Sequence, residues 1–151
     1  MAWRALVLAD VQTGLSAQEL TGIQTYALQN GQPDPTPAAI AAAMDEVRGY
    51  IAASRTIALG AEQTIPDKLV DTAIDLVVWK LVTRFPTKLM ATDARRQRYQ
   101  DAISRLKDVA SNKFRIEIPT ETTSEETAGV PLPQVSSWGV RRRVQREEDE
   151  V

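Results

Sequence analysis

Apolar residues recur at helical spacing in four segments of the chain, and each segment has a recognisable start. The first follows Ser16 and Glu19, which form the S-x-x-E pattern of a capping box. The residues after them predict a helix over about 17–28, and the turn-forming stretch NGQPDP ends it. The apolar positions that predict this helix are Leu20, Ile23 and Ala27.

A second helix is predicted after the proline-rich turn. Thr36 is a suitable N-cap, and Pro37 fits the first helical position, where no backbone N–H is needed. The helix extends to about Ser54 or Arg55. One apolar stripe runs along it: Ile40, Ala43, Met44, Val47, Tyr50 and Ile51.

The third segment is apolar around most of its circumference. Pro66 favours a helix start, and the run continues to Phe85, where Pro86 stops it. A helix with apolar residues on every side has neighbours on several sides. We therefore predict that the helix over residues 66–85 lies at the centre of the fold, with Trp79 and Phe85 in the core.

A fourth helix is predicted from the N-cap Thr92 to about Asn112. Beyond it, Phe114–Ile118 alternates apolar and charged residues at a period of two, which predicts a short strand or an extended arm. The N-terminal WRALVLADV is compatible with a strand-like arm or a short helix. The inner stripe of the fourth helix is Tyr99, Ala102, Ile103, Leu106, Val109 and Ala110.

These elements predict an all-α protein: a small bundle of about four helices, a short extended segment and a long extended C-terminal arm. The composition changes after Pro119, where TETTSEETAGVPLPQVSS offers few residues that can form a core. We therefore expect a helical domain over residues 1–119 and an extended arm over residues 120–151.

Composition and charge narrow the classes of function. The 151 residues carry a net charge of −2 and include no cysteine and no histidine. The absence of cysteine excludes disulfides and thiolate sites. The absence of histidine removes the residue that most often serves as a general base or as a metal ligand. Asp71 and Asp75 lie one helical turn apart, which fits a solvated helix face better than a metal site. We expect a protein that is not an enzyme and has no cofactor and no metal.

The N-terminus lacks the pattern of a signal peptide, and no stretch approaches the ~20 apolar residues of a membrane span. We therefore expect no membrane partner. Three arginines near the start of the fourth helix suit phosphate contacts: Arg95, Arg96 and Arg98. Three carboxylates of the same helix favour an ordinary charged face instead: Asp93, Asp101 and Asp108.

The C-terminal arm contains a candidate partner-binding site. Trp138 is a large aromatic residue in a segment with no core of its own, and four arginines follow it. Trp and Arg are the residue types most enriched in interface hot spots. A disordered, solubilising tail is the alternative. The residues expected to bind a partner are Trp138, Val140, Arg141, Arg142, Arg143, Val144 and Arg146.

The order of the segments resembles that of the small phage head-to-tail connector proteins, the adaptor family, most closely the Mu-like neck protein type. The likeness covers about Leu15 to Phe114. It rests on LSAQELTGI, AAIAAAMDEVRGYIAAS, IPDKLVDTAIDLVVWKLV and ARRQRYQDAISRLKDVASNKF. Asn112 stands where a glycine is usual. Matching positions are Asp45, Glu46, Val47 and Tyr50, then Pro66, Leu69, Ala73, Ile74 and Leu76, then Arg98, Tyr99, Asp101, Ala102, Ile103, Leu106, Ala110 and Lys113.

This resemblance implies a structural protein of the virion neck, made in the cytoplasm of the host bacterium. It implies a homo-oligomeric, twelve-fold ring beneath the portal protein that joins the capsid to the tail. The implied partners are the portal, a tail-side neck or tail-completion protein, and neighbouring copies of the chain. Packaged DNA would pass through the lumen of the ring. The C-terminal arm would clasp the portal or a neighbouring subunit, and no enzymatic activity is implied.

Two other functions stay open at this point. One is a DNA-binding or nucleoprotein-binding regulator that uses the arginines of the fourth helix and of the arm. The other is a small assembly chaperone whose arm docks onto a partner. The near-neutral net charge, with alternating signs, argues against the regulator.

Overall fold

A computed structural model describes residues 3–84 and 92–119 of the chain. In this part the protein is an all-α bundle, as predicted, with one small antiparallel sheet. The elements occur in this order: β1 (Trp3–Arg4), α1 (Leu8–Gly14), α2 (Ala17–Gln29), α3 (Pro35–Ala53), β2 (Ile65–Pro66), the 3-10 turn η1 (Asp67–Leu69), α4 (Val70–Val82) and α5 (Asp93–Ala110).

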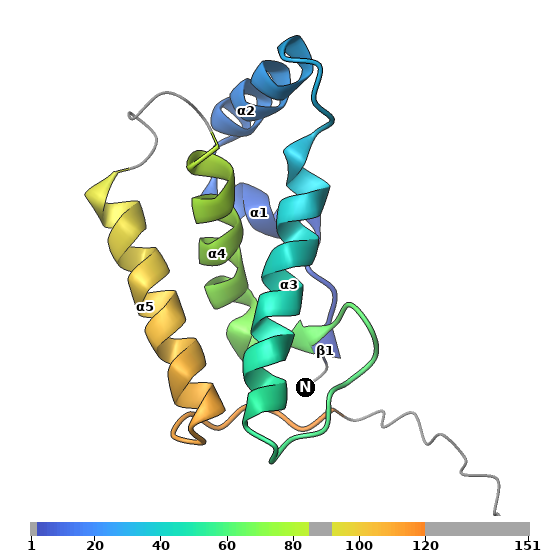
Figure 1. Ribbon diagram of the computed structural model, residues 1–151, viewed down its shortest axis with the longest axis vertical. Helices are drawn as coiled ribbons and strands as arrows, with labels where there is room; N and C mark the ends of the chain where they lie inside the picture. Colours follow the sequence, from blue (N-terminus) through green and yellow to red (C-terminus); the bar gives the residue numbers. More distant parts are fainter. Residues whose placement is uncertain (1–2, 85–91, 120–151) are drawn as a thin grey trace, which may run out of the picture.

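Three long helices stand side by side, and α4 runs antiparallel to α3 and α5 (Figure 1). The short helix α1 lies behind α4 in this view. Helix α2 lies beyond one end of the bundle, whereas β1 and the segment after α5 lie at the opposite end (Figure 1). The described part of the molecule therefore has two distinct ends, one formed by α2 and one formed by the sheet.

Helix α4 is the centre of the bundle, which confirms the prediction for this segment. It contacts α3, α5 and α1. The approach of α1 is close, because a Cβ added at Gly14 would lie 2.8 Å from Cγ2 of Val78 and 2.9 Å from Cγ2 of Ile74. The buried residues of α4 are Val70, Thr72, Ala73, Ile74, Leu76, Val77, Val78, Leu81 and Val82.

The predicted start of α3 was wrong by two residues. Asp34, not Thr36, is the N-cap, since its Oδ1 accepts a hydrogen bond from the Thr36 backbone N–H at 2.8 Å. Pro35 then occupies the first helical position. The error has a simple cause: the dipeptides Asp-Pro and Thr-Pro follow each other here, and both fit the same start signal.

The predicted start of the central helix was also wrong. Pro66 belongs to β2 and pairs with Trp3, while Ile65 pairs with Arg4. The turn η1 follows, and α4 begins only at Val70. The N-terminal segment thus contains both of the alternatives left open by its sequence, first a strand and then a helix.

The other two helix starts are confirmed. The Ser16 backbone N–H donates to Oε2 of Glu19 at 3.0 Å, and the Glu19 N–H donates to Oγ of Ser16 at 3.3 Å. At α5, the Arg95 N–H donates to Oγ1 of Thr92 at 3.4 Å. Both caps satisfy backbone N–H groups that have no partner within the helix.

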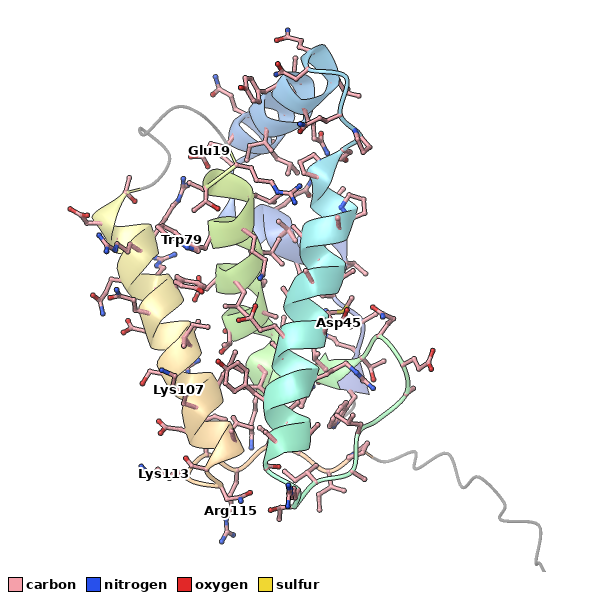
Figure 2. The ribbon with its side chains drawn as sticks, viewed as in Figure 1. Glu19, Asp45, Trp79, Lys107, Lys113 and Arg115 are labelled. Atoms are coloured by element: carbon pink, nitrogen blue, oxygen red, sulfur yellow. The ribbon has the colours of Figure 1, made fainter. Side chains whose placement is uncertain are left out.

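Trp79 is half-buried rather than fully inside the core. It stacks on Tyr99, with ring centroids 5.5 Å apart and planes inclined by 21°, so the pair covers the junction of α4 and α5. Figure 2 shows Trp79 between these helices. Phe85, which was predicted to share the core, lies outside the described residues.

Asn112 adopts a positive φ of 59° at the end of α5. The neighbouring Lys113 N–H donates to the carbonyl of Asp108 at 2.9 Å, which closes the helix end. Asparagine tolerates the left-handed conformation better than most other non-glycine residues. The residue that replaces the usual glycine at this position therefore preserves the same backbone turn.

Candidate assembly surfaces

The seven residues predicted to bind a partner all lie outside the described residues: Trp138, Val140, Arg141, Arg142, Arg143, Val144 and Arg146. The structure describes the chain up to Pro119, the last residue before the predicted arm. Pro119 lies near Gly60 and Trp3, and the segment after α5 lies at the end of the bundle that carries β1 (Figure 1).

Trp3 holds the segment that leads into the arm. Its indole Nε1 donates to the carbonyl oxygen of Glu117 at 3.0 Å, across 114 residues of sequence. Gly60 lies against the same indole, where an added Cβ would be 2.8 Å from Cε3 of Trp3 and 3.2 Å from Cβ of Pro119. A larger side chain at Gly60 would displace the indole. These contacts join the N-terminal strand, the loop before β2 and the root of the arm.

Charged groups also hold this end of the bundle together. Arg4 pairs with Asp10 at 2.8 Å and with Asp67 at 3.2 Å. The hydrogen bond from Arg4 lowers the pKa of Asp10, and the backbone N–H of Val7 lowers it further. Arg48 on α3 donates to the carbonyls of the loop, at 2.8 Å for both Ala61 and Thr64. The loop and β1 are therefore fixed to the bundle by hydrogen bonds rather than by apolar packing alone.

Glu117 is the least satisfied group at this end. Both of its carboxylate oxygens are buried and accept no hydrogen bond within the part of the chain that the structure describes. Nζ of Lys68 is 3.8 Å away, which is an ion-pair distance but too long for a hydrogen bond. The attraction of Lys68 thus offsets only part of the cost of burying this carboxylate.

The segment Phe114–Ile118 takes the extended-arm alternative of its prediction. It forms no strand pair with any other described residue. Ile116 is buried against the bundle, whereas Ile118 is 74% exposed. The period-two alternation therefore holds from Phe114 to Ile116 and fails at Ile118, where the apolar side chain is exposed.

At the opposite end, Glu19 connects α2 to α5. Nη2 of Arg95 donates to both carboxylate oxygens of Glu19, at 2.8 and 3.0 Å. Figure 2 shows Glu19 where α2 meets the bundle. A second link runs from Nε2 of Gln24 to Oδ2 of Asp34 at 2.9 Å. One carboxylate therefore both caps α2 and fixes its position.

Replacing Glu19 with Gln should weaken the attachment of α2 and remove a pH dependence. Burial raises the pKa of Glu19, but the hydrogen bonds from Arg95 and Ser16 outweigh it and leave the pKa below its usual value of 4.5. A carboxyl group with a lowered pKa stabilises the fold above its unfolded pKa, and this stability is lost as the pH falls through the folded value. Gln can keep the capping bond from the Ser16 N–H with its one oxygen, but its NH2 group cannot accept the bond that Arg95 donates to Oε1, so the variant removes the charge together with one hydrogen bond.

We expect the free energy of unfolding of the parent to exceed that of Glu19→Gln by about 1 kcal/mol at pH 7. The difference is small because the side chains of Glu19 and Arg95 are partly exposed. The difference should shrink as the pH falls below about 4.5. Thermal melts of both proteins at pH 7 and at about pH 3 measure it. If the difference in melting temperature between the two proteins were the same at pH 7 and at about pH 3, the charge of Glu19 would not stabilise the attachment of α2.

The three arginines that suit phosphate contacts have different surroundings. Arg95 is bonded to Glu19, whereas Arg96 and Arg98 are exposed. Arg98 lines a surface depression together with Asp71 and Asp75. Desolvation raises the pKa of Asp75, and the charge of Arg98 opposes this rise. The two acidic groups thus share a depression with an arginine at the junction of α4 and α5, where Asp71 is exposed and Asp75 is half-buried.

Within residues 3–84 and 92–119, no group of three or more acidic residues is arranged to hold a metal ion. In the same part of the chain, no helix is both long enough and apolar enough to span a membrane. The residues that sequence analysis missed are Trp3, Gly60 and Glu117. The available signal was Trp3 itself, because a tryptophan buries a large apolar surface and its N–H usually finds a hydrogen-bond partner when buried.

One protein-family model matches the sequence. A model of the protein family described as "Bacteriophage Mu, Gp36" matches residues 7–134. The match includes every helix of the described residues and continues past Pro119 into the segment predicted to be an arm, but it stops before Trp138. No curated protein and no solved structure gives a significant match. Since the family match spans most of the chain, the protein belongs to the bacteriophage Mu Gp36 family and is a phage structural or morphogenesis protein.

Proposed function

We propose that this protein is a head-to-tail connector, an adaptor that forms a ring beneath the portal and joins the capsid to the tail. The observation that carries the proposal is the family match through the whole helical bundle. The order of the helices also agrees with the connector resemblance found in the sequence. The twelve-fold ring and the position in the virion neck are parts of this proposal.

The shape of the described part supports an adaptor role. A connector contacts its neighbours around the ring and also contacts partners above and below it. The arm starts at a point fixed by Trp3 and Gly60, at the end of the bundle remote from α2. Residues 120–151 reach about 100 Å when fully extended. An arm with a fixed root and this reach suits contact with the portal or a neighbouring subunit.

The proposal has consequences for partners and chemistry. The partners are the portal, a tail-side neck or tail-completion protein, and further copies of the chain. Packaged DNA passes through the lumen without sequence-specific contacts. The protein catalyses no reaction and needs no cofactor. Trp138 and the arginines after it are the proposed contacts with the portal or a neighbouring subunit.

DNA binding is the main competing function, and the ion pair of Arg95 with Glu19 weighs against it. This pair occupies one of the three arginines that phosphate contacts would require. Carboxylates from the same helix lie among the others. A steep fall of DNA affinity with salt concentration would support the competing function, because each phosphate contact releases counterions.

Electron microscopy tests the connector proposal. Purified protein mixed with purified portal should give a ring stacked on the portal, and intact particles should show the same ring between head and tail. Particles assembled without the protein should contain heads that lack attached tails. Density beneath the portal that this chain does not fill, or normal tails in its absence, would contradict the proposal.

A further inference from the structure

Residues 115–119 lie across one end of the bundle and are held there by few contacts. Ile116 is buried, and the indole N–H of Trp3 donates to the carbonyl of Glu117 at 3.0 Å. Within the part of the chain that the structure describes, this is the only hydrogen bond between residues 115–119 and the rest of the protein. The segment is therefore attached mainly by one buried side chain and one indole. We call residues 115–119 the latch.

The carboxylate of Glu117 works against the closed position of the latch. Both of its oxygens are buried, and neither accepts a hydrogen bond from any described residue. Nζ of Lys68 lies 3.8 Å from Oε1 of Glu117, but the side chain of Lys68 is half exposed, so solvent screens its charge. A buried carboxylate without hydrogen-bond donors is less stable than the same group in water. Opening the latch would let water solvate this group.

The chain before the latch is fixed more firmly. The backbone N–H groups of Lys113 and Phe114 both donate to the carbonyl of Asp108, at 2.9 and 3.1 Å. Nδ2 of Asn112 donates to the carbonyl of Ser54 at 3.4 Å. These bonds tie the end of α5 as far as Phe114, so the boundary between the fixed chain and the latch lies just after this residue.

We propose that the latch opens and closes while the bundle stays folded, and that the buried charge of Glu117 sets how often it opens. Burial of Ile116 and the hydrogen bond from Trp3 favour the closed form, whereas solvation of Glu117 favours the open form. No strand pairing has to be broken, because the latch pairs with no described strand. Leu106 and Val109, the buried residues of α5 nearest to the latch, remain in the core.

Opening changes what this end of the molecule presents. It uncovers Ile116 and frees the indole N–H of Trp3 and the carboxylate of Glu117. The five released residues span about 17 Å when fully extended. A molecule that binds one of these freed groups shifts the balance toward the open form, because it has no such contact in the closed form. The latch is a property of the bundle itself and does not depend on the proposed function.

Proteolysis measures the opening, because a trypsin site lies inside the latch. Arg115 is exposed at the end of α5 (Figure 2), but cleavage after it also requires the buried Ile116 to leave the bundle. The initial rate of this cleavage, followed by mass spectrometry, is divided by the rate for a peptide of the same sequence over residues 111–121. This cleavage ratio reports the fraction of open molecules when closing is faster than cleavage. It should exceed the globally unfolded fraction, measured by urea denaturation, by about 100-fold or more.

Glu117→Met should keep the latch closed. Methionine is unbranched and flexible like glutamate but carries no charge, so the closed form no longer buries a carboxylate. The cleavage ratio should fall by about tenfold or more. Glu62→Met is the matched control, because it makes the same change at an exposed position of the loop before β2, and it should leave the ratio unchanged.

Trp3→Phe should have the opposite effect. It keeps an aromatic ring but lacks the N–H that donates to the carbonyl of Glu117. The closed form loses its hydrogen bond, and the cleavage ratio should rise several-fold.

A double-mutant cycle assigns the effect of Glu117 to its charge. Lys68→Met removes the cation that faces Glu117, so it should raise the cleavage ratio by about threefold in the parent. In the Glu117→Met background the same change should have no effect, because no carboxylate is left to stabilise. Lys68 is half exposed, so the bundle tolerates the substitution.

Four results would overturn the inference. The first is a cleavage ratio equal to the globally unfolded fraction, since the latch would then open only together with the bundle. The others are a ratio for Glu117→Met that is not below that of the parent, a ratio for Trp3→Phe that is not above it, and equal effects of Lys68→Met in both backgrounds. Urea denaturation of every variant separates a change of global stability from a change of opening. All of these measurements use the free protein, so they leave the connector proposal untouched.

Discussion

Replacing Val77 with Asp should unfold the helical bundle. Val77 is fully buried on α4, the helix that contacts α3, α5 and α1 together. A carboxylate buried there without a partner costs several kcal/mol, through its ionised form or through a forced rise of its pKa. The total stability of a domain of this size is only about 5–15 kcal/mol. We therefore expect loss of the helical circular dichroism signal and of the cooperative melt.

A matched substitution separates the effect of charge from that of shape. Val77→Thr has nearly the same outline but buries a hydroxyl group, which costs about 1–3 kcal/mol. This variant should remain folded and melt at a lower temperature than the parent. If Val77→Asp melted close to the parent instead, α4 would not be the centre of the bundle, and the packing described for it would be wrong.

The helices could be predicted from sequence where local signals agree. Ser16 and Glu19 define the start of α2, and Thr92 defines the start of α5, because each cap depends on residues a few positions apart. The start of α3 was misplaced where two cap signals overlap within four residues, at Asp34 and Thr36. The local sequence pattern therefore predicted that a helix exists here, but it could not distinguish between two equally suitable N-cap residues.

Long-range contacts could not be predicted in this way. The capping role of Glu19 is visible in the sequence, but its partner Arg95 lies 76 residues away. Pro66 resembles a helix start, and only its pairing with Trp3 places it in a strand. The hydrogen bond from Trp3 to Glu117, which fixes the segment before the predicted arm, could not be predicted because the two residues lie 114 positions apart. Nothing local to either residue specifies the other.

The candidate partner-binding site could be inferred from sequence only by residue type, because no long-range contact could be predicted for it. Its predicted residues, from Trp138 to Arg146, were chosen by residue type, and this choice stays a prediction. The family match ends at residue 134, before all of them.

Deleting residues 136–151 should abolish attachment to the portal and leave the bundle folded. The deleted segment begins well after Pro119, so Trp3 keeps its bond to Glu117 and the root of the arm is unchanged. The proposed anchor, Trp138, is removed together with the four arginines that follow it. The helical circular dichroism signal should match that of the parent, while co-sedimentation with the portal is lost.

Trp138→Ala separates the anchor from the rest of the arm. A buried tryptophan at the centre of an interface contributes on the order of 2 kcal/mol or more. This corresponds to a weakening of about 30-fold per subunit. The loss compounds in a ring, because each subunit binds with the help of its neighbours. Deletion of residues 147–151 is the matched control, since it removes only the acidic end and its last valine, and it should leave binding near the parent level. Equal co-sedimentation of the parent, Trp138→Ala and the 136–151 deletion would show that the arm does not bind the portal and serves only to keep the protein in solution.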